Sequence, residues 1–225
     1  MAKKPMKRAE QEEIIYNSKH WKLFKELRSK TIRTMETLDN LHLSSIVHGS
    51  IVRGDVSDMS DIDIYLPEPP SSFSIETALE WSGFQCYQRT IIQATPLYAL
   101  KGYIALDHQT SLSFPLVKLR PVEKEFYRFG GKASLSELGK EKRNSGVDKR
   151  LMLIEPSEEG HIETTVVGNE ERVANLLGVS LNTVLDRVRA LIRRDEVGRT
   201  GVFIEKELAS DETYEQAMKL SLIHI

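Results

Sequence analysis

Cysteine is scarce in this chain, and long apolar runs are missing. The 225 residues include one cysteine, Cys86, so no internal disulfide can form. No Cys or His stands near it at zinc-ligand spacing, which favours a buried structural thiol. No apolar stretch approaches the roughly 18–20 residues that cross a bilayer, and the basic start, residues 1–5, lacks a following signal-peptide core. We therefore expect a cytoplasmic protein with no membrane partner.

Neither positive nor negative charge predominates in the chain. The formal net charge is −2 at pH 7, so the chain as a whole does not have the basic character of many nucleic-acid binders. From Lys118 to Arg150, however, ten Lys and Arg residues stand against five Asp and Glu residues. This segment is either an ordinary solvated surface or a surface that attracts a polyanionic acceptor. The sequence leaves both interpretations open.

The most informative pattern lies between residues 46 and 65. An apolar run ends at Gly49 and Ser50, and eleven residues after Ser50 the acids Asp61 and Asp63 stand two apart in a second apolar run. Strand side chains alternate between faces, so both carboxylates are expected on one side of a strand. Burying such a pair is costly without a cation, and Mg²⁺ commonly takes one or two carboxylates together with phosphate oxygens. The pair is therefore a candidate Mg²⁺ or Mn²⁺ site for a nucleotide.

The wider pattern has a family resemblance, carried by Gly49-Ser50, Arg53-Gly54 and Ser60-Asp61-Ile62-Asp63-Ile64. It resembles the signature of the polymerase-β-type nucleotidyltransferase superfamily, and most closely the archaeal and bacterial minimal nucleotidyltransferases. The resemblance implies that the Gly-Ser turn holds the triphosphate. It also implies that the two aspartates bind two divalent metal ions together with a third acid from a later strand.

Arg53 and Ser60 complete the expected nucleotide-binding set with Gly49 and Ser50. A guanidinium group binds phosphate bidentately, which makes Arg53 a candidate contact to phosphate or base. The alternative is a surface arginine that pairs with Asp55 or Asp58.

The third acid is where the sequence departs from the family pattern. Residues 111–114 are expected to form a strand after the motif, but they contain no acid. Asp107, which follows the apolar run 103–106, is the best catalytic candidate, although an aspartate at this place also starts turns well. Weaker alternatives are Asp55, Asp58 and Glu76. Without a third carboxylate, nucleotidyl transfer is expected to be slow or absent.

Hydrophobic periodicity and turn residues predict an α+β fold with helices flanking a mixed sheet. A proline-rich stretch from Pro67 ends the second motif strand, and a break near residues 156–160 suggests domains at 1–158 and 159–225. The expected helices are 9–38, 74–81 and 134–142; the expected strands are 44–52, 61–66, 84–95, 97–106, 111–118 and 150–155.

The second domain is expected to be a helix-turn-helix or winged-helix module. Two helices, 169–177 and 180–194, meet at a Gly-Val-Ser turn, and residues 197–204 are expected to form a glycine-rich hairpin. The second helix would present possible nucleic-acid contacts, namely Asn182, Thr183, Arg187 and Arg189. The alternative is a helix pair that never touches DNA, since fold resemblance alone does not establish function.

Two functions remain in competition. The first is a Mg²⁺-dependent nucleotidyltransferase that moves a nucleoside monophosphate from an NTP to an unidentified hydroxyl, which includes a nucleic-acid end. The second is an NTP-sensing, DNA-binding transcriptional regulator with a weak or inactive nucleotidyltransferase fold. An antitoxin-like protein that modifies or masks a partner ranks last, because the chain is longer than those proteins usually are.

Overall fold

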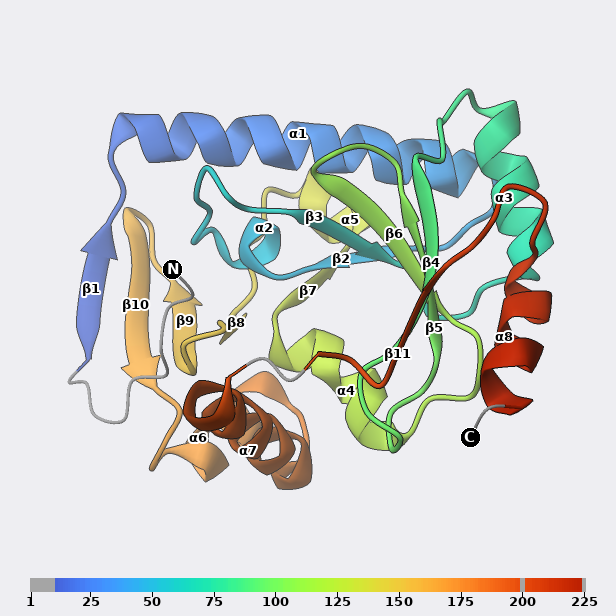
Figure 1. Ribbon diagram of the computed structural model, residues 1–225. Helices are drawn as coiled ribbons and strands as arrows, with labels where there is room; N and C mark the ends of the chain where they lie inside the picture. Colours follow the sequence, from blue (N-terminus) through green and yellow to red (C-terminus); the bar gives the residue numbers. More distant parts are fainter. Residues whose placement is uncertain (1–10, 199–200, 224–225) are drawn as a thin grey trace. The chain divides into compact units, whose positions relative to one another are not determined.

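The computed structural model describes residues 11–198 and 201–223, and it has the α+β composition that the sequence predicts (Figure 1). The described residues fall into two compact units. Unit 1 is formed by the described residues of Met1–Lys30, Val47–Ser60 and Pro121–Thr200. Unit 2 is formed by those of Thr31–Ile46, Asp61–Arg120 and Gly201–Ile225.

Unit 1 contains an antiparallel sheet in the order β1-β10-β9-β8. Its strands are β1 (Glu12–Ile15), β8 (Gly146–Val147), β9 (Met152–Pro156) and β10 (Gly160–Thr165). Two further short strands, which are not part of this antiparallel sheet, are β2 (Ile46–His48) and β7 (Lys132–Ser134). Its helices are α2 (Ser50–Arg53), α4 (Pro121–Phe129), α5 (Leu135–Gly139), α6 (Glu170–Leu177) and α7 (Leu181–Val197). The long helix α1 (Ser18–Asn40) begins in unit 1, and its last residues are counted in unit 2.

The helix pair α6 and α7 forms where the sequence predicts it. Gly178 ends α6 in the left-handed conformation, with φ of 60°. The Ser180 side chain then caps α7 by accepting a hydrogen bond from the Thr183 amide. A side chain at Gly178 would also meet the guanidinium of Arg128 at 3.0 Å. Glycine is therefore required at this turn by its backbone conformation and by the close neighbour.

The apolar residues of α6 and α7 share one core with the rest of unit 1. Val173, Leu177 and Val184 pack in the same buried cluster as Phe129 of α4 and Leu153 of β9. The predicted boundary after residue 158 falls between β9 and β10, which pair antiparallel. The structure therefore divides the chain differently from the predicted 1–158 and 159–225, because the two helices need the sheet of unit 1 to bury their apolar faces.

Unit 2 contains five strands in the order β11-β4-β5-β6-β3. They are β3 (Ile62–Tyr65), β4 (Gln88–Gln93), β5 (Lys101–Ala105), β6 (Thr110–Pro115) and β11 (Ile204–Glu207). Strands β3 and β6 are parallel, and the other three pairs are antiparallel. The helices of this unit are α3 (Ser72–Trp81) and α8 (Tyr214–Ile223).

The wing predicted after the helix pair is described only in part. The expected hairpin at 197–204 includes residues 199 and 200, which lie outside the described residues. The described part continues into β11, whose Glu205 is paired with Ile92 of β4 in unit 2. Residues 204–207 therefore satisfy their backbone hydrogen bonds in the sheet of unit 2 and not in a hairpin beside α7.

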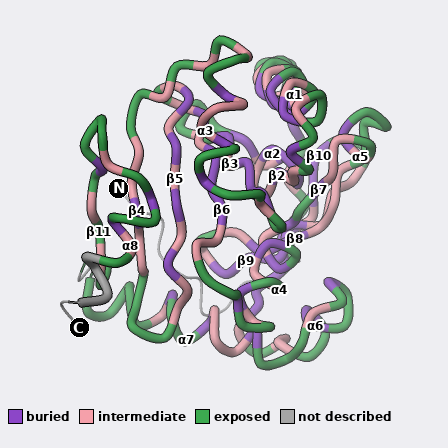
Figure 2. Tube along the Cα trace, turned by 90° about the vertical axis from the view of Figure 1, so that its right-hand side faces the viewer, coloured by how far each residue is buried: buried purple, intermediate pink, exposed green. Residues whose placement is uncertain are grey.

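One face of β3, β5 and β6 is largely apolar. Ile62, Ile64, Ile104 and Leu112 have no exposed surface, and Figure 2 marks buried positions along these strands in purple. On this face Gly102 is needed by packing, because a Cβ there would lie 2.6 Å from the ring of Phe114. The opposite face of β3 and β6 carries Asp63, Ser111 and Ser113 together with the buried ring of Tyr65.

Within the described part of the chain, no helix combines the length and the apolar character that a membrane span requires.

Candidate functional site

Asp61 directly precedes β3 in unit 2, and Asp63 is the second residue of this strand. Asp63 is half-buried within the strand, and Asp61 is exposed directly before it. Ile62 between them is completely buried, and its amide donates to the Gln109 carbonyl at 2.8 Å. Asp63 thus projects from the face of β3 opposite to Ile62 and Ile64, whereas Asp61 lies directly before the strand.

Ser111 of β6 is the immediate neighbour of Asp63. The two residues are partners in the parallel pairing of β3 and β6, and the Ser111 hydroxyl donates to Asp63 Oδ1 at 3.1 Å. The charge of Asp63 also acts on Tyr103 of β5. Burial is the larger cause and the Asp63 charge the second, and together they raise the pKa of Tyr103 to about 12. Sequence reasoning noted only that this strand lacks an acid, and it gave no role to Ser111.

Asp107 does not join the carboxylate pair in the way that the sequence prediction required. It lies in the turn between β5 and β6, where its Oδ1 accepts hydrogen bonds from the amides of Gln109 at 2.8 Å and Thr110 at 2.9 Å. The alternative interpretation, a turn-forming aspartate, therefore describes its observed contacts.

The weaker candidates for a third acid are engaged with cations. Each one pairs within its own unit: Asp55 with Arg53, Asp58 with Lys19, and Glu76 with Arg89. Across the described residues, no three or more His, Cys, Asp or Glu side chains are grouped so that they could hold a metal ion.

The residues present fit one divalent cation better than two. Mg²⁺ is commonly bound through one or two carboxylates and completes its shell with water and phosphate oxygens, which the Asp61–Asp63 pair allows. A two-metal site instead needs carboxylates that bridge ions about 3.5–4 Å apart. Among the described residues no third acid is grouped with this pair, and Asp107 uses its Oδ1 to hold the turn between β5 and β6.

The predicted phosphate turn has a conformation that only glycine adopts easily. Gly49 has φ of 92° and precedes α2, and a Cβ placed there would meet nothing within 4 Å. The Ser50 hydroxyl donates to the Ser60 hydroxyl at 3.1 Å. The structure therefore brings together two of the predicted nucleotide-binding residues, Ser50 and Ser60, within unit 1.

Arg53 has a structural position, which corrects its predicted contact to the nucleotide. Its guanidinium forms a two-pronged ion pair with Asp55, with both N–O distances 2.9 Å, and it also donates to the Gly130 carbonyl. The residue is only 6% exposed. Since its donors are directed at these partners, the alternative interpretation of an Arg53–Asp55 pair holds, and the pair is buried.

The carboxylate of Glu125 in α4 is hydrogen-bonded to residues at the start of α7. The Glu125 carboxylate accepts hydrogen bonds from the Ser180 amide and hydroxyl and from the Thr183 hydroxyl. Burial acts to raise the pKa of Glu125, but these hydrogen bonds outweigh it and hold the pKa below its ordinary value. Thr183 is also 1% exposed. Thr183 is therefore a helix-start residue bonded to Glu125, which corrects its predicted contact to nucleic acid.

The other three predicted nucleic-acid residues differ in accessibility. Asn182 and Arg189 are exposed. Arg187 is half-buried, and its guanidinium lies 4.8 Å from the ring centre of Phe126. A stacked arginine covers apolar surface as well as carrying charge. Asn182 and Arg189 are thus the exposed members of the predicted set.

A buried polar network in unit 1 escaped the sequence analysis. The Tyr16 hydroxyl is hydrogen-bonded to His161 Nδ1, and His161 Nε2 lies 3.0 Å from Glu163 Oε1. Arg150 bridges Glu163 and Asp148. Burial raises the pKa of Tyr16, the largest influence on it. No local signal announces this network, because Tyr16 and His161 are 145 residues apart.

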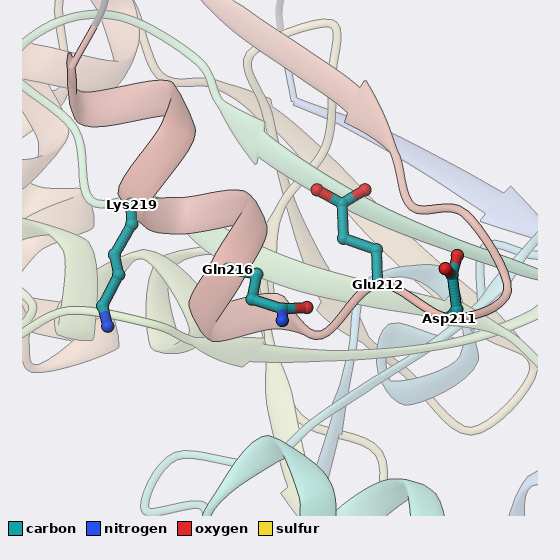
Figure 3. Close-up of a pocket in the computed structure, with 4 residues that line it drawn as sticks. All are labelled: Asp211, Glu212, Gln216 and Lys219. Atoms are coloured by element: carbon teal, nitrogen blue, oxygen red, sulfur yellow. The ribbon is translucent and has the colours of Figure 1, made fainter.

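A shallow pocket in unit 2 offers little for a ligand. Its volume is about 460 Å³, and it is lined by Asp211, Glu212, Gln216 and Lys219 (Figure 3). Glu212 forms an ion pair with Lys206, and this contact lowers the pKa of Glu212. In Figure 3 the Lys219 side chain points away from the two carboxylates. The pocket therefore lacks a converging set of charges.

Comparisons with known proteins leave the family unassigned. No family model matches the sequence, and no curated protein matches it either.

Proposed function

We propose that this chain is a Mg²⁺-dependent nucleotidyltransferase that moves a nucleoside monophosphate from an NTP to a hydroxyl acceptor. The observation that carries the proposal is the position of Asp63 on β3, between the fully buried Ile62 and Ile64. This alternation directs Asp63 to the polar side of the strand, and Asp61 has the same parity. Asp61 and Asp63 would hold the cation, and Mn²⁺ would replace Mg²⁺ there.

The phosphate role is assigned to the Gly49–Ser50 turn. The open space in front of Gly49 supports close approach of an anion to the backbone. The Ser50 hydroxyl is bonded to that of Ser60, and the next residue of the chain is Asp61. Arg53 is left out of this assignment because its guanidinium is buried against Asp55.

The transfer step is an exchange of oxygen atoms at the α-phosphorus. The acceptor oxygen forms a bond to that phosphorus, the bond to the β-phosphate's bridging oxygen breaks, and pyrophosphate leaves with the electron pair. The acceptor proton passes to solvent water. When bound, the divalent cation neutralises phosphate charge and stabilises the leaving oxygens.

Asp63→Asn is expected to abolish cation-dependent nucleotide binding, and Asp61→Asn is expected to weaken it strongly. Each change removes one of the two negative charges offered to the cation. Isothermal titration with Mg²⁺ and each NTP measures binding, and label from the α-phosphate measures transfer into a nuclease-treated or protease-treated cell extract. Asp39→Asn, an exposed acid on α1, is the matched control. Unchanged binding in both variants would exclude the cation site.

A second candidate is an NTP-sensing regulator that binds DNA through α6 and α7. Two observations favour it: the Asp107 carboxylate is engaged in a turn, and Arg189 is exposed on α7. For this candidate, the intact protein should retain Mg²⁺·NTP without transferring label.

Under the regulator hypothesis, Arg189→Ala is expected to weaken binding to duplex DNA and to reduce the salt slope by about 1. The reason is the loss of one phosphate contact and its released counterion. Fluorescence anisotropy over a range of salt concentrations measures both. Arg33→Ala, an exposed arginine of α1, is the control. If the intact protein has no salt-dependent affinity for DNA, the regulator hypothesis fails.

A further inference from the structure

The residue beside Asp63 is a serine where a two-metal site would need an acid. Ser111 is the register partner of Asp63 on the parallel strand β6. Partners on adjacent strands project to the same face of a sheet, so a carboxylate at this position would lie beside Asp63. The Ser111 hydroxyl instead donates to Asp63 Oδ1 at 3.1 Å.

The surrounding acids of unit 2 are committed elsewhere. Asp107 accepts two turn amides through Oδ1. Glu76 pairs with Arg89, whose guanidinium also donates to the carbonyls of Ala209 and Ser210. These contacts anchor the turn and the segment before α8, so moving either acid would disrupt local structure. Within the described part of the chain, neither acid is grouped with Asp61 and Asp63 so that three carboxylates could hold a metal ion.

We infer that this site takes a single divalent cation, which arrives with the NTP phosphates, and that Ser111 is a positioning residue for Asp63. The inference rests on the proposed function, and it differs from the two-metal arrangement that the family resemblance implies. By donating to Oδ1, Ser111 fixes the carboxylate and leaves its other oxygen for the cation. Outer-shell hydrogen bonds of this kind orient metal-binding carboxylates.

The consequence for chemistry is a slow transfer step. One cation bound to the phosphates assists the leaving group, but no protein-held cation lowers the pKa of the acceptor hydroxyl. The acceptor must then lose its proton to solvent without such help. Adding the absent carboxylate at Ser111 is expected to change both the number of cations held and the rate.

Equilibrium dialysis tests the stoichiometry without relying on activity. The full chain is dialysed against Mn²⁺ and the α,β-methylene analogues of ATP, GTP, CTP and UTP, each in turn, and protein-bound manganese and nucleotide are measured separately. We expect one manganese ion per bound nucleotide for the wild-type chain and two for Ser111→Asp. Ser74→Asp, which adds an exposed acid in the first turn of α3, should remain at one.

Two further variants test the positioning role without adding charge. Ser111→Ala removes the hydrogen bond to Asp63 and should weaken Mn²⁺-dependent nucleotide binding by about tenfold. Ser111→Thr keeps a hydroxyl and should restore most of the affinity. Thermal unfolding with and without Mn²⁺ shows whether each variant is folded, and Ser111→Asp should gain more stability from the ion than the wild-type chain does.

The outcomes distinguish failure of the one-cation inference from failure of the proposed function. Two manganese ions per nucleotide in the wild-type chain would overturn the one-cation inference, and unchanged affinity in Ser111→Ala would overturn the positioning role of Ser111; in both cases the nucleotide-binding proposal stands. If the wild-type chain retains none of the four nucleotides, the proposed function fails and the inference fails with it. A folded Ser111→Asp that still holds one ion would also contradict the role assigned to this position.

Discussion

Replacing Arg53 by methionine is expected to lower the free energy of unfolding by about 4 kcal/mol, because it leaves a charge unpaired. Asp55 is half-buried, and both of its carboxylate oxygens accept hydrogen bonds from Arg53. The same guanidinium donates to the carbonyls of Gly130 and Val147, which lose a partner in the variant. Chemical denaturation followed by circular dichroism measures the loss.

A second substitution separates lost attraction from the cost of an unpaired acid. The double variant Arg53→Met/Asp55→Leu leaves no charge unpaired, so part of the free energy of unfolding that Arg53→Met loses should return. Arg33→Met on the exposed side of α1 is the matched control and should change stability by less than about 0.5 kcal/mol. A single Arg53→Met variant as stable as the wild-type chain would contradict the structural role given to Arg53.

Glu163→Gln is expected to destabilise the chain by about 3 kcal/mol at neutral pH. Burial alone would raise the pKa of Glu163, but hydrogen bonds from His161 and Arg150 outweigh burial and lower the pKa to about 2, from an ordinary value of 4.5. The folded state therefore binds a proton on Glu163 less readily than the unfolded chain does. The stability from this group is fully present above pH 4.5 and is lost as the pH falls towards 2.

The pH dependence distinguishes this ion pair from simple packing. The stability difference between the wild-type chain and Glu163→Gln should shrink steadily as the pH is lowered through that window, when measured by urea unfolding at each pH. Glu158→Gln, at an exposed site two residues before β10, should show no such difference. A difference that stays constant with pH would indicate that the carboxylate charge does not contribute.

Local patterns in the sequence predicted the parts of the fold that depend on neighbouring residues. The alternation around Asp63 predicted β3, and the Gly-Val-Ser turn at residues 178–180 predicted the meeting of α6 and α7. The alternative interpretation of Asp107 as a turn-starting residue agrees with its position between the antiparallel strands β5 and β6. By contrast, α4 and β10 were missed, because the basic segment and the proline break hid their periodicity.

Tertiary contacts decided the remaining features, and these involve residues far apart in the chain. Whether Arg53 faces a ligand or Asp55 depends on the carbonyls of Gly130 and Val147, 77 and 94 residues away. The sequence by itself determined the strand β3, with Asp63 between two buried isoleucines, and a turn at Gly49. Only the folded chain decided that the neighbour of Asp63 is Ser111, because register between strands is set by the packing of whole faces and not by either strand alone.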